Sequence, residues 1–299
     1  MDSYRIIEII CSASENNASL ERVLRGRGYS RRIITAMKRI ENGITRDGKL
    51  CRSIDNVFEG DVIRLKIPEG SSRQSEVMPC CTVVEKAYED SDYVIYDKPP
   101  LMPVHRSFGH VDDTLENVFY AEYPDIPFRP VYRLDRDTSG LCLAAKNKLC
   151  ANITGGIDKV YFAVCCGVIS EPMTIDAPIA LTDEQHMLRA VSPEGKRAVT
   201  HISPVVSENG YTLLRIRLET GRTHQIRVHM SHIGFPLAGD KMYGGNAEHI
   251  SRQALHCGEI SFIHPVIGEI ICIRSQLPND IVQIVQADNL QNMIYSELI

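Results

Sequence analysis

The sequence predicts an α+β protein in two parts: a small N-terminal α/β module in residues 1–68, and a larger domain with a mostly antiparallel mixed sheet in residues 82–299. The first part is basic and helix-like, whereas strands and turns dominate from Cys81 onward. Residues 69–81 between them are polar and lack periodicity, which is typical of a linker. In the larger part, strands and helices do not alternate regularly, and this favours antiparallel pairing.

The N-terminal module is predicted from apolar spacing and turn residues. Its expected elements, in order, are a strand at 4–11, two helices within 19–40, a hairpin over 43–49 and a closing strand at 60–65. Glycines divide the helical stretch, and Ser30 is placed to cap the second helix. Asp47-Gly48 is a strong signal for a tight hairpin turn.

The larger domain is predicted mainly from strand-like runs. Its expected elements are strands at 82–86, 93–98, 215–218 and 269–273, a helix at 223–232 and a C-terminal helix from Pro278. Pro99-Pro100 ends the second strand. Alternation of apolar and polar residues supports the third strand, and Thr220-Gly221 precedes the internal helix.

Charge is distributed unevenly along the chain. The protein carries a net charge of −5, yet residues 21–52 contain ten Lys or Arg against three Asp or Glu. Such a run can be an ordinary solvated helix face. Here the arginines cluster at a helix start, where backbone N–H groups already favour phosphate. The candidate RNA-binding residues of this module are Arg31, Arg32, Lys38 and Arg39.

Several classes of protein are not expected. The ten cysteines form no C-x-x-C pair, so the sequence supports neither a zinc ribbon nor a thioredoxin motif. The chain has no signal-peptide pattern and no run of 18 apolar residues, so we expect a cytoplasmic protein that does not bind membranes. His224, His229 and His232 are five and eight residues apart, which does not match a helical zinc pair, and we expect no metal.

Three short segments place an acid, a phenol and several guanidinium groups across about 90 residues. They are residues 133–140 (RLDRDTSG), 159–161 (KVY) and 221–227 (GRTHQIR). In order and spacing they resemble the three motifs of the RluA-type RNA pseudouridine synthases. The resemblance extends over about residues 82–280 and implies isomerisation of uridine in RNA, so that C5 instead of N1 is bonded to the ribose.

The resemblance implies a role for each matching residue. Asp135 takes the catalytic position, Tyr161 lies near the uracil and acts in the C5 proton step, and Arg227 pairs with the aspartate and keeps it charged. Arg133 matches a residue implicated in flipping the target nucleotide. Arg222 and His224 are candidate RNA contacts. The reaction requires no cofactor, and the expected partner is ribosomal or transfer RNA, bound by a monomer.

The N-terminal segment resembles an S4-type RNA-binding module over roughly residues 16–67, although its hairpin loop differs. Two departures from the synthase pattern are expected to flank the cleft: Tyr132 where histidine is usual, and a short segment at 147–158. Two other functions stay open from sequence. One is an RNA-binding protein that keeps the fold without turnover, and the other is a magnesium phosphatase that uses Asp135 and Asp137.

Overall fold

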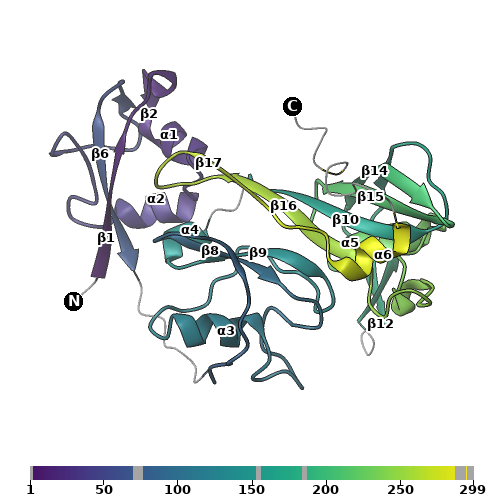
Figure 1. Ribbon diagram of the computed structural model, residues 1–299. Coiled ribbons are helices and arrows are strands. Elements are labelled where there is room, and N and C mark those ends of the chain that lie inside the picture. Colours follow the sequence, from purple (N-terminus) through teal and green to yellow (C-terminus); the bar gives the residue numbers. More distant parts are fainter. Residues whose placement is uncertain (1–2, 70–76, 153–155, 184–186, 287–293, 295–299) are drawn as a thin grey trace.

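The computed structural model describes residues 3–69, 77–152, 156–183, 187–286 and 294. Its main features are two separate sheets, a small one formed by the N-terminal residues and a long one through the rest of the chain (Figure 1). The small sheet has the strand order β1-β6-β3-β4. The long sheet has the order β11-β14-β15-β10-β16-β9-β8-β7, and β17 pairs with β16 beside it.

The N-terminal part contains the elements that its sequence predicts, which are β1 (Ser3–Ile10), α1 (Leu20–Gly26), α2 (Arg31–Met37), the hairpin of β3 (Ile44–Arg46) and β4 (Lys49–Leu50), and β6 (Val62–Glu69). It also contains three short elements that were not predicted, namely η1 (Ala13–Glu15), β2 (Ala18–Ser19) and β5 (Asn56–Val57). The Ser30 side chain caps α2 by accepting a hydrogen bond from the backbone N–H of Ile33. Asp47 and Gly48 both have positive φ angles, as the predicted two-residue hairpin turn requires.

The long sheet is antiparallel except where β16 pairs with β9, which confirms the mostly antiparallel α+β prediction. Its strands are β7 (Lys86–Glu89), β8 (Tyr93–Lys98), β9 (Ser139–Ala145), β10 (Asp158–Cys166), β11 (Met173–Asp176), β14 (Val199–Glu208), β15 (Tyr211–Leu218), β16 (Leu255–Ile263) and β17 (Ile270–Arg274). A separate hairpin pairs β12 (Ile179–Asp183) with β13 (Leu188–Val191).

Short helices flank the long sheet. They are α3 (Leu115–Glu122), α4 (Lys148–Ala151), α5 (Gln225–His232), η2 (Lys241–Tyr243) and α6 (Asn279–Val285). Figure 1 shows α3 beside the β8–β9 half of the sheet, with α5 and α6 at the β14–β15 half. None of the helices in the described ranges combines the length and the apolar character that a membrane crossing needs.

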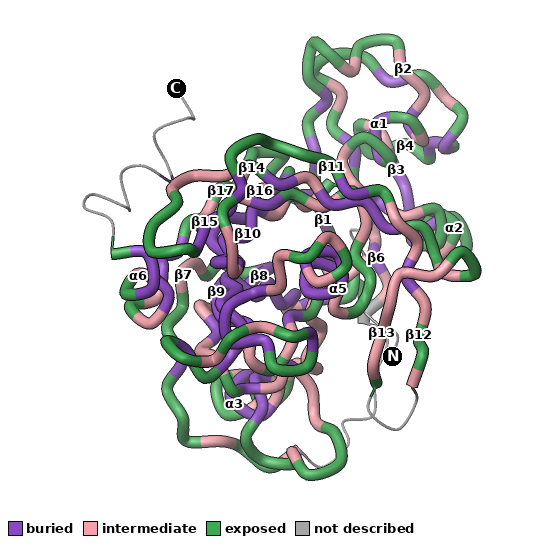
Figure 2. Tube along the Cα trace, turned by 90° about the vertical axis from the view of Figure 1, so that its right-hand side faces the viewer, coloured by how far each residue is buried: buried purple, intermediate pink, exposed green. Residues whose placement is uncertain are grey.

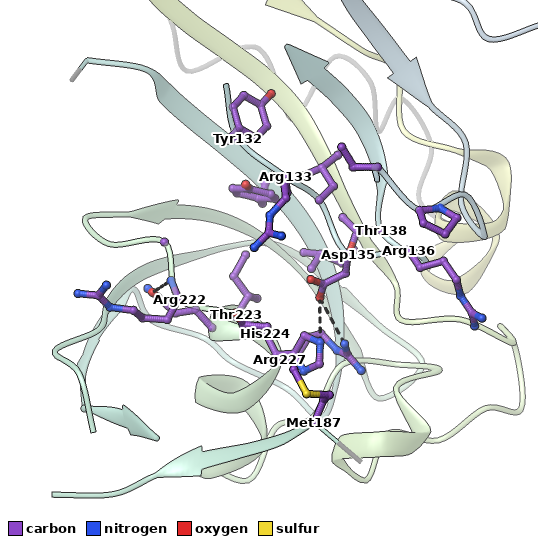
Figure 3. A pocket seen from close by; sticks show the side chains of 18 of the residues that line it. Tyr132, Arg133, Asp135, Arg136, Thr138, Met187, Arg222, Thr223, His224 and Arg227 are labelled. Carbon is purple, nitrogen blue, oxygen red and sulfur yellow. Dashed lines mark hydrogen bonds and ion pairs between the residues drawn. The ribbon is translucent and has the colours of Figure 1, made fainter. Parts of the chain in front are cut away.

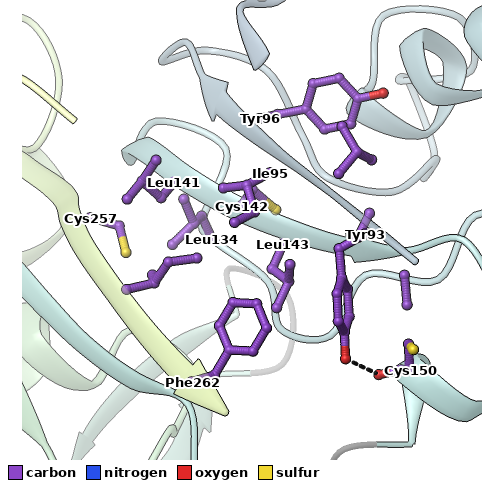
Figure 4. Close-up of a cluster of buried hydrophobic side chains, with 14 of the residues drawn as sticks. Tyr93, Ile95, Tyr96, Leu134, Leu141, Cys142, Leu143, Cys150, Cys257 and Phe262 are labelled. Atoms are coloured by element: carbon purple, nitrogen blue, oxygen red, sulfur yellow. Dashed lines mark hydrogen bonds between the residues drawn. The ribbon is translucent and has the colours of Figure 1, made fainter. Parts of the chain in front are cut away.

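The core runs along the middle of the long sheet, where burial is continuous in the tube of Figure 2. All seven residues of β9 are buried, because side chains cover both of its faces. Leu141, Cys142 and Leu143 pack near Phe262 and Tyr93 (Figure 4). The Tyr93 hydroxyl, deep in this core, donates to the backbone carbonyl of Cys150 at 3.2 Å. The central strands therefore form a rigid support for the loops at their ends.

Two predicted elements differ from the structure. Residues 82–85 form no regular strand, because pairing with β8 begins only at Lys86 and is itself interrupted by a register shift between Lys86 and Tyr88. The C-terminal helix starts near Pro278 as predicted but ends at Val285, where Gln286 takes a left-handed conformation with φ 44°. The rest of that predicted helix, apart from Ile294, lies outside the described residues.

The N-terminal part packs directly against the larger domain. Arg5 of β1 forms an ion pair with Asp92, which also accepts a hydrogen bond from Asn147 at 2.6 Å. Tyr29, which follows α1, is buried near this pair. Figure 1 shows the β16–β17 hairpin reaching the same module, and there Gly268 lies close to the Arg27 side chain. One continuous apolar cluster extends across both parts.

Candidate active site

A pocket of about 670 Å³ brings together residues from all three sequence motifs (Figure 3). The pocket lies where β10, β15 and the turn before β9 contribute lining residues, and Arg189 of β13 also lines it. Its lining includes Val104, His105, Arg106, Tyr132, Arg133, Asp135, Lys159, Tyr161, Met187, Arg189, Arg222, His224 and Arg227. Its size is in the range of small-molecule sites and is compatible with one nucleotide.

Asp135 lies in the turn that leads into β9. The backbone N–H of Thr138 donates to the Asp135 carbonyl at 3.1 Å and closes this turn. Gly140 follows with φ 106°, and a Cβ there would come within 2.3 Å of the Cys257 carbonyl oxygen, so β9 lies tightly against β16. The Asp135 carboxylate remains 27% exposed and faces the pocket. It is thus accessible to a substrate on a firmly held backbone.

Arg227 connects two aspartates. Its Nε and Nη2 atoms donate to the two carboxylate oxygens of Asp240 at 2.6 and 2.8 Å, and its Nη1 donates to Asp135 Oδ2 at 3.3 Å. The Arg227 and Asp240 side chains are only 8% and 1% exposed. Burial opposes the charge of Arg227, but attraction and hydrogen bonding from Asp240 outweigh it, so the pKa of Arg227 is raised further. Arg227 therefore stays cationic beside Asp135.

Asp240 has no role assigned from sequence. Gly239-Asp240 and Tyr243-Gly244-Gly245 also resemble the synthase pattern, but this resemblance does not show that they face the third motif. In the structure, the Tyr243 ring lies 4.9 Å below the Arg227 guanidinium. The predicted pairing of Arg227 with the catalytic-position aspartate is found, and its closer partner is Asp240.

Tyr161 lies in β10 and lines the pocket while only 7% of it is exposed. Burial, with further contributions from Cys257 and Asp135, raises the pKa of Tyr161 well above its ordinary value. The phenol is therefore neutral at neutral pH and can donate its proton in a hydrogen bond. Neighbouring Tyr132 also lines the pocket, as expected, and its hydroxyl donates to the Leu141 carbonyl at 2.7 Å.

Two exposed arginines lie on the pocket wall. Arg133 extends into the pocket beside Asp135, and Arg222 lies across from it (Figure 3). The Nε atom of Arg222 donates to the Arg197 carbonyl at 3.0 Å. Asp137, the second aspartate of the phosphatase interpretation, is bound by Arg136 at 2.7 Å and is not among the lining residues. The two aspartates therefore do not converge on one site.

Lys98 supports the turn that holds Asp135. It is fully buried, and its Nζ donates to the carbonyl oxygens of Pro99, Met102 and Arg136 at 2.8, 2.9 and 3.1 Å. Burial lowers the pKa of Lys98 to about 8. Because Arg136 directly follows Asp135, this lysine ties the turn to the end of β8. The sequence indicated Lys98 only as part of the matching Asp97-Lys98-Pro99 segment.

The basic residues predicted in the N-terminal module lie mainly on one surface. Arg31, Arg32 and Arg39 line a shallow cavity of about 450 Å³ on the outer side of α2. Lys38 does not line this cavity, and its Nζ lies 3.6 Å from the Glu21 carboxylate. Three of the four candidate residues therefore form a shared cationic surface.

The short 147–158 segment was expected to flank the cleft. None of its described residues lines the pocket. Asn147 and Cys150 instead contact Asp92 and Tyr93, beside the N-terminal module. The reason is that the Asp135 turn precedes β9 and this segment follows it, so the two lie at opposite ends of the strand.

The histidines near the third motif have separate partners. His224 Nδ1 lies 2.9 Å from the Tyr243 hydroxyl, and buried His229 bonds Thr200 and the Ala177 carbonyl. His232 is exposed. The three do not converge.

A different group, Asp90, Asp92 and His264, brings three possible metal ligands together. The oxygens of Asp90 already accept hydrogen bonds from the Tyr88 hydroxyl and from the backbone N–H groups of Asp92 and Tyr93. Arg5 pairs with Asp92, so the donors that are present occupy both carboxylates and the group does not fit a resident cation.

Comparisons with known proteins point to one family. Residues 92–232 match the RNA pseudouridylate synthase family. The uncharacterised RNA pseudouridine synthase YjbO of Bacillus subtilis is 35% identical over 88% of this chain and 96% of its own length. Ribosomal large subunit pseudouridine synthase D of Pseudomonas aeruginosa is 38% identical over 79% of this chain and 81% of its own length.

Solved structures show the same fold. Human RNA pseudouridylate synthase domain containing 1 superposes with a TM-score of 0.56 at 23% identity, covering 65% of this chain and 83% of its own. Human RNA pseudouridylate synthase domain containing 4 gives a TM-score of 0.52 at 22% identity, with 66% and 90% covered.

Proposed function

This chain belongs to the RNA pseudouridylate synthase family, whose members isomerise uridine in RNA, and we propose that its own substrate is a uridine in ribosomal RNA. Several relatives at 35–40% identity bear the name of a ribosomal large subunit pseudouridine synthase, which supports this choice over transfer RNA. We further propose that the protein acts as a cytoplasmic monomer.

The reaction places definite demands on the pocket. The N1–C1′ bond breaks, the uracil turns, and a C5–C1′ bond forms. The C5 hydrogen is lost and N1 gains one, so the composition is unchanged. The protein must supply a nucleophile, a group near C5 to handle the proton, and a site that excludes water. This chemistry needs no redox centre.

We assign the nucleophile to Asp135, charge stabilisation to Arg227, and contact with the uracil and the C5 proton step to Tyr161. The observation that carries this assignment is that all three line one pocket, with Arg227 3.3 Å from Asp135. The Arg227 guanidinium, held in place by Asp240, presents a fixed positive charge to the Asp135 carboxylate. Tyr161 is a neutral phenol, so it acts as a hydrogen-bond donor until a partner takes up its proton.

RNA is bound, in this proposal, at two surfaces. Arg133 and Arg222 contact the target nucleotide and its neighbours at the pocket, with Arg133 entering the space that the flipped base leaves. The S4-like module contributes Arg31, Arg32 and Arg39, with Lys38 beside them, as contacts to phosphates farther along the RNA. Because phosphate contacts carry little sequence information, site choice rests on RNA shape around the pocket.

Release of tritium from RNA that contains [5-³H]uridine tests the activity directly. We expect the purified protein to release tritium from ribosomal RNA lacking its own modification, and EDTA to leave the rate unchanged. Pseudouridine mapping of total RNA with and without the gene product then identifies the site. Tight RNA binding without tritium release would support the non-catalytic alternative, and modification confined to transfer RNA would overturn the choice of substrate.

A further inference from the structure

We propose that His224 is a positioning residue for Asp135: Tyr243 holds its imidazole with the proton on Nε2, and this N–H faces Asp135 Oδ2 on the side that Arg227 binds, leaving Oδ1 as the reactive oxygen. The inference rests on the proposed function in taking Asp135 as the nucleophile. It adds a second donor to the aspartate and assigns the two carboxylate oxygens different tasks.

The backbone at His224 is held in an uncommon conformation. Its φ and ψ angles of 57° and 19° are left-handed, which costs a non-glycine residue on the order of 1 kcal/mol. Gln225 fixes the turn, because its Oε1 accepts hydrogen bonds from the Arg222 backbone N–H at 2.9 Å and from the Thr220 hydroxyl at 2.8 Å. The turn directs the imidazole into the pocket, next to Asp135 (Figure 3). Strain that is kept at a pocket residue indicates a function for its side chain.

The Tyr243 hydroxyl sets the tautomer of His224. The backbone N–H of Arg189 donates to the Tyr243 hydroxyl oxygen at 3.3 Å, so one lone pair of that oxygen is already engaged. The phenolic proton then points to His224 Nδ1, 2.9 Å away. With Nδ1 accepting, the imidazole carries its proton on Nε2. The Nε2 atom lies 3.8 Å from Asp135 Oδ2, and the negative charge there favours the same tautomer.

The charges around His224 keep it neutral. Burial lowers its pKa below the ordinary value. Asp135 and Asp240 act against that shift, whereas Arg227 and Arg189 reinforce it, and Tyr243 contributes a neutral hydroxyl. A neutral N–H donor orients the carboxylate without adding a second positive charge. This difference matters, because two cations on one carboxylate would weaken it as a nucleophile.

Both groups face a single oxygen. Arg227 Nη1 donates to Asp135 Oδ2 at 3.3 Å, and His224 Nε2 lies 3.8 Å from the same oxygen, just beyond hydrogen-bond distance. In the described part of the chain, no hydrogen bond engages Oδ1. Figure 3 shows both contacts converging from one side of the carboxylate. We infer that this one-sided arrangement orients the carboxylate and presents its other oxygen to the substrate.

Paired substitutions at His224 separate positioning from packing. Asparagine tolerates the left-handed backbone at least as well as histidine but places no donor at the Nε2 position, whereas the glutamine amide can reach it. We expect His224→Asn to lower kcat by about 10- to 100-fold with KM within about 3-fold, as the removal of supporting contacts to a site typically does. His224→Gln should recover part of that decrease.

Tyr243→Phe provides the pH readout. Without the hydroxyl, Nδ1 has no donor and can bind a proton, so the pKa of His224 rises. The protonated imidazole would then place a second cation on Asp135, and kcat should fall as the pH decreases through that raised pKa, in a limb absent from the wild-type profile. Nitrogen-15 NMR of the imidazole should find Nε2 protonated in the wild type and a mixture of tautomers in Tyr243→Phe.

Wild-type kcat in His224→Asn, or an Nδ1-protonated imidazole in the wild type, would overturn the inference. Failure of the proposed function looks different: the wild-type protein itself would release no tritium, while the NMR measurement would still report the tautomer. If His224→Asn raises KM and leaves kcat unchanged, His224 is an RNA contact instead of a positioning residue, and the inference is wrong.

Discussion

At the scale of single residues, Asp135 and Asp137 provide a matched pair of carboxylates. Asp135→Asn keeps the side-chain size but removes the charge and the nucleophilic oxygen. Tritium release should fall below detection, while RNA affinity measured by filter binding changes little, because phosphate contacts dominate it. Asp137→Asn is the control and should retain substantial activity, since Asp137 pairs with Arg136 and does not itself line the pocket. Measurable turnover by folded Asp135→Asn would contradict its assignment.

Arg227 and Asp240 should be coupled in stability. Removing one partner of a buried ion pair leaves an uncompensated charge, so Arg227→Met should lower the free energy of unfolding by about 3–5 kcal/mol in urea. Adding Asp240→Asn should recover at least about 1 kcal/mol, because a neutral amide is less costly to bury unpaired. In the exposed pair Arg136–Asp137, Arg136→Met should cost no more than about 1 kcal/mol. Additive destabilisation in the double variant would refute the coupling.

At the scale of elements, the parallel contact of β9 with β16 holds a buried histidine. His256 accepts and donates between Ser139 and Ser275 at 3.0 and 3.1 Å, and burial lowers its pKa to about 3. The folded protein therefore binds fewer protons than the unfolded chain below pH 6.5, and stability decreases as the pH falls toward 3. This histidine should lower the free energy of unfolding by about 2 kcal/mol between pH 8 and pH 5.

Urea unfolding at several pH values measures that decrease. His229 and His224 have pKa values lowered in the same direction, so the wild-type slope contains more than one contribution. His256→Gln isolates one of them, because glutamine keeps a polar end near the serines and does not titrate. An unchanged pH slope in this variant would show that His256 is protonated in the folded state.

The sequence predicted an element correctly where residues adjacent in the chain determine that element. The strand at 93–98 and the turn at Asp47-Gly48 depend on adjacent residues, and both occur as expected. The strand at 82–86 failed because pairing at a sheet edge is decided by the neighbouring strand. Asp240 and Tyr243 were not assigned to the site for a similar reason. Gly234 and Pro236 signal the end of α5, but they do not show that the following chain returns to Arg227.

At the scale of the whole molecule, the cationic surface of α2 should supply affinity and not chemistry. Replacing Arg31, Arg32 and Arg39 with glutamine should raise the Kd for RNA and reduce the slope of log K against log salt by about 0.7–0.9 for each phosphate that the protein no longer neutralises. Turnover at saturating RNA should persist. Arg52→Gln, which removes a charge paired with Asp55, is the control and should alter the slope less.

Point variants test the role of the α2 surface more directly than deletion of the N-terminal module does. Removing residues 1–75 would also remove Arg5 from Asp92 and uncover part of the shared apolar cluster, so inactivity could reflect unfolding. If the triple variant abolishes turnover even at saturating RNA, the module contributes to the active site itself.

Synthesis order matters for this enzyme, because the strand that supports Asp135 is joined to a partner that the ribosome makes much later. Ser139 and His256 are 117 positions apart, and Gly140 is packed closely only once Cys257 is present. At translation rates of roughly 5–20 residues per second, the nascent chain waits on the order of ten seconds with β9 unpaired on that side. Pairing over such a separation is also slow to form. We therefore expect the turn that holds Asp135 to gain its full support only after residues 256 and 257 have been made, with the apolar β9 open to aggregation during that interval.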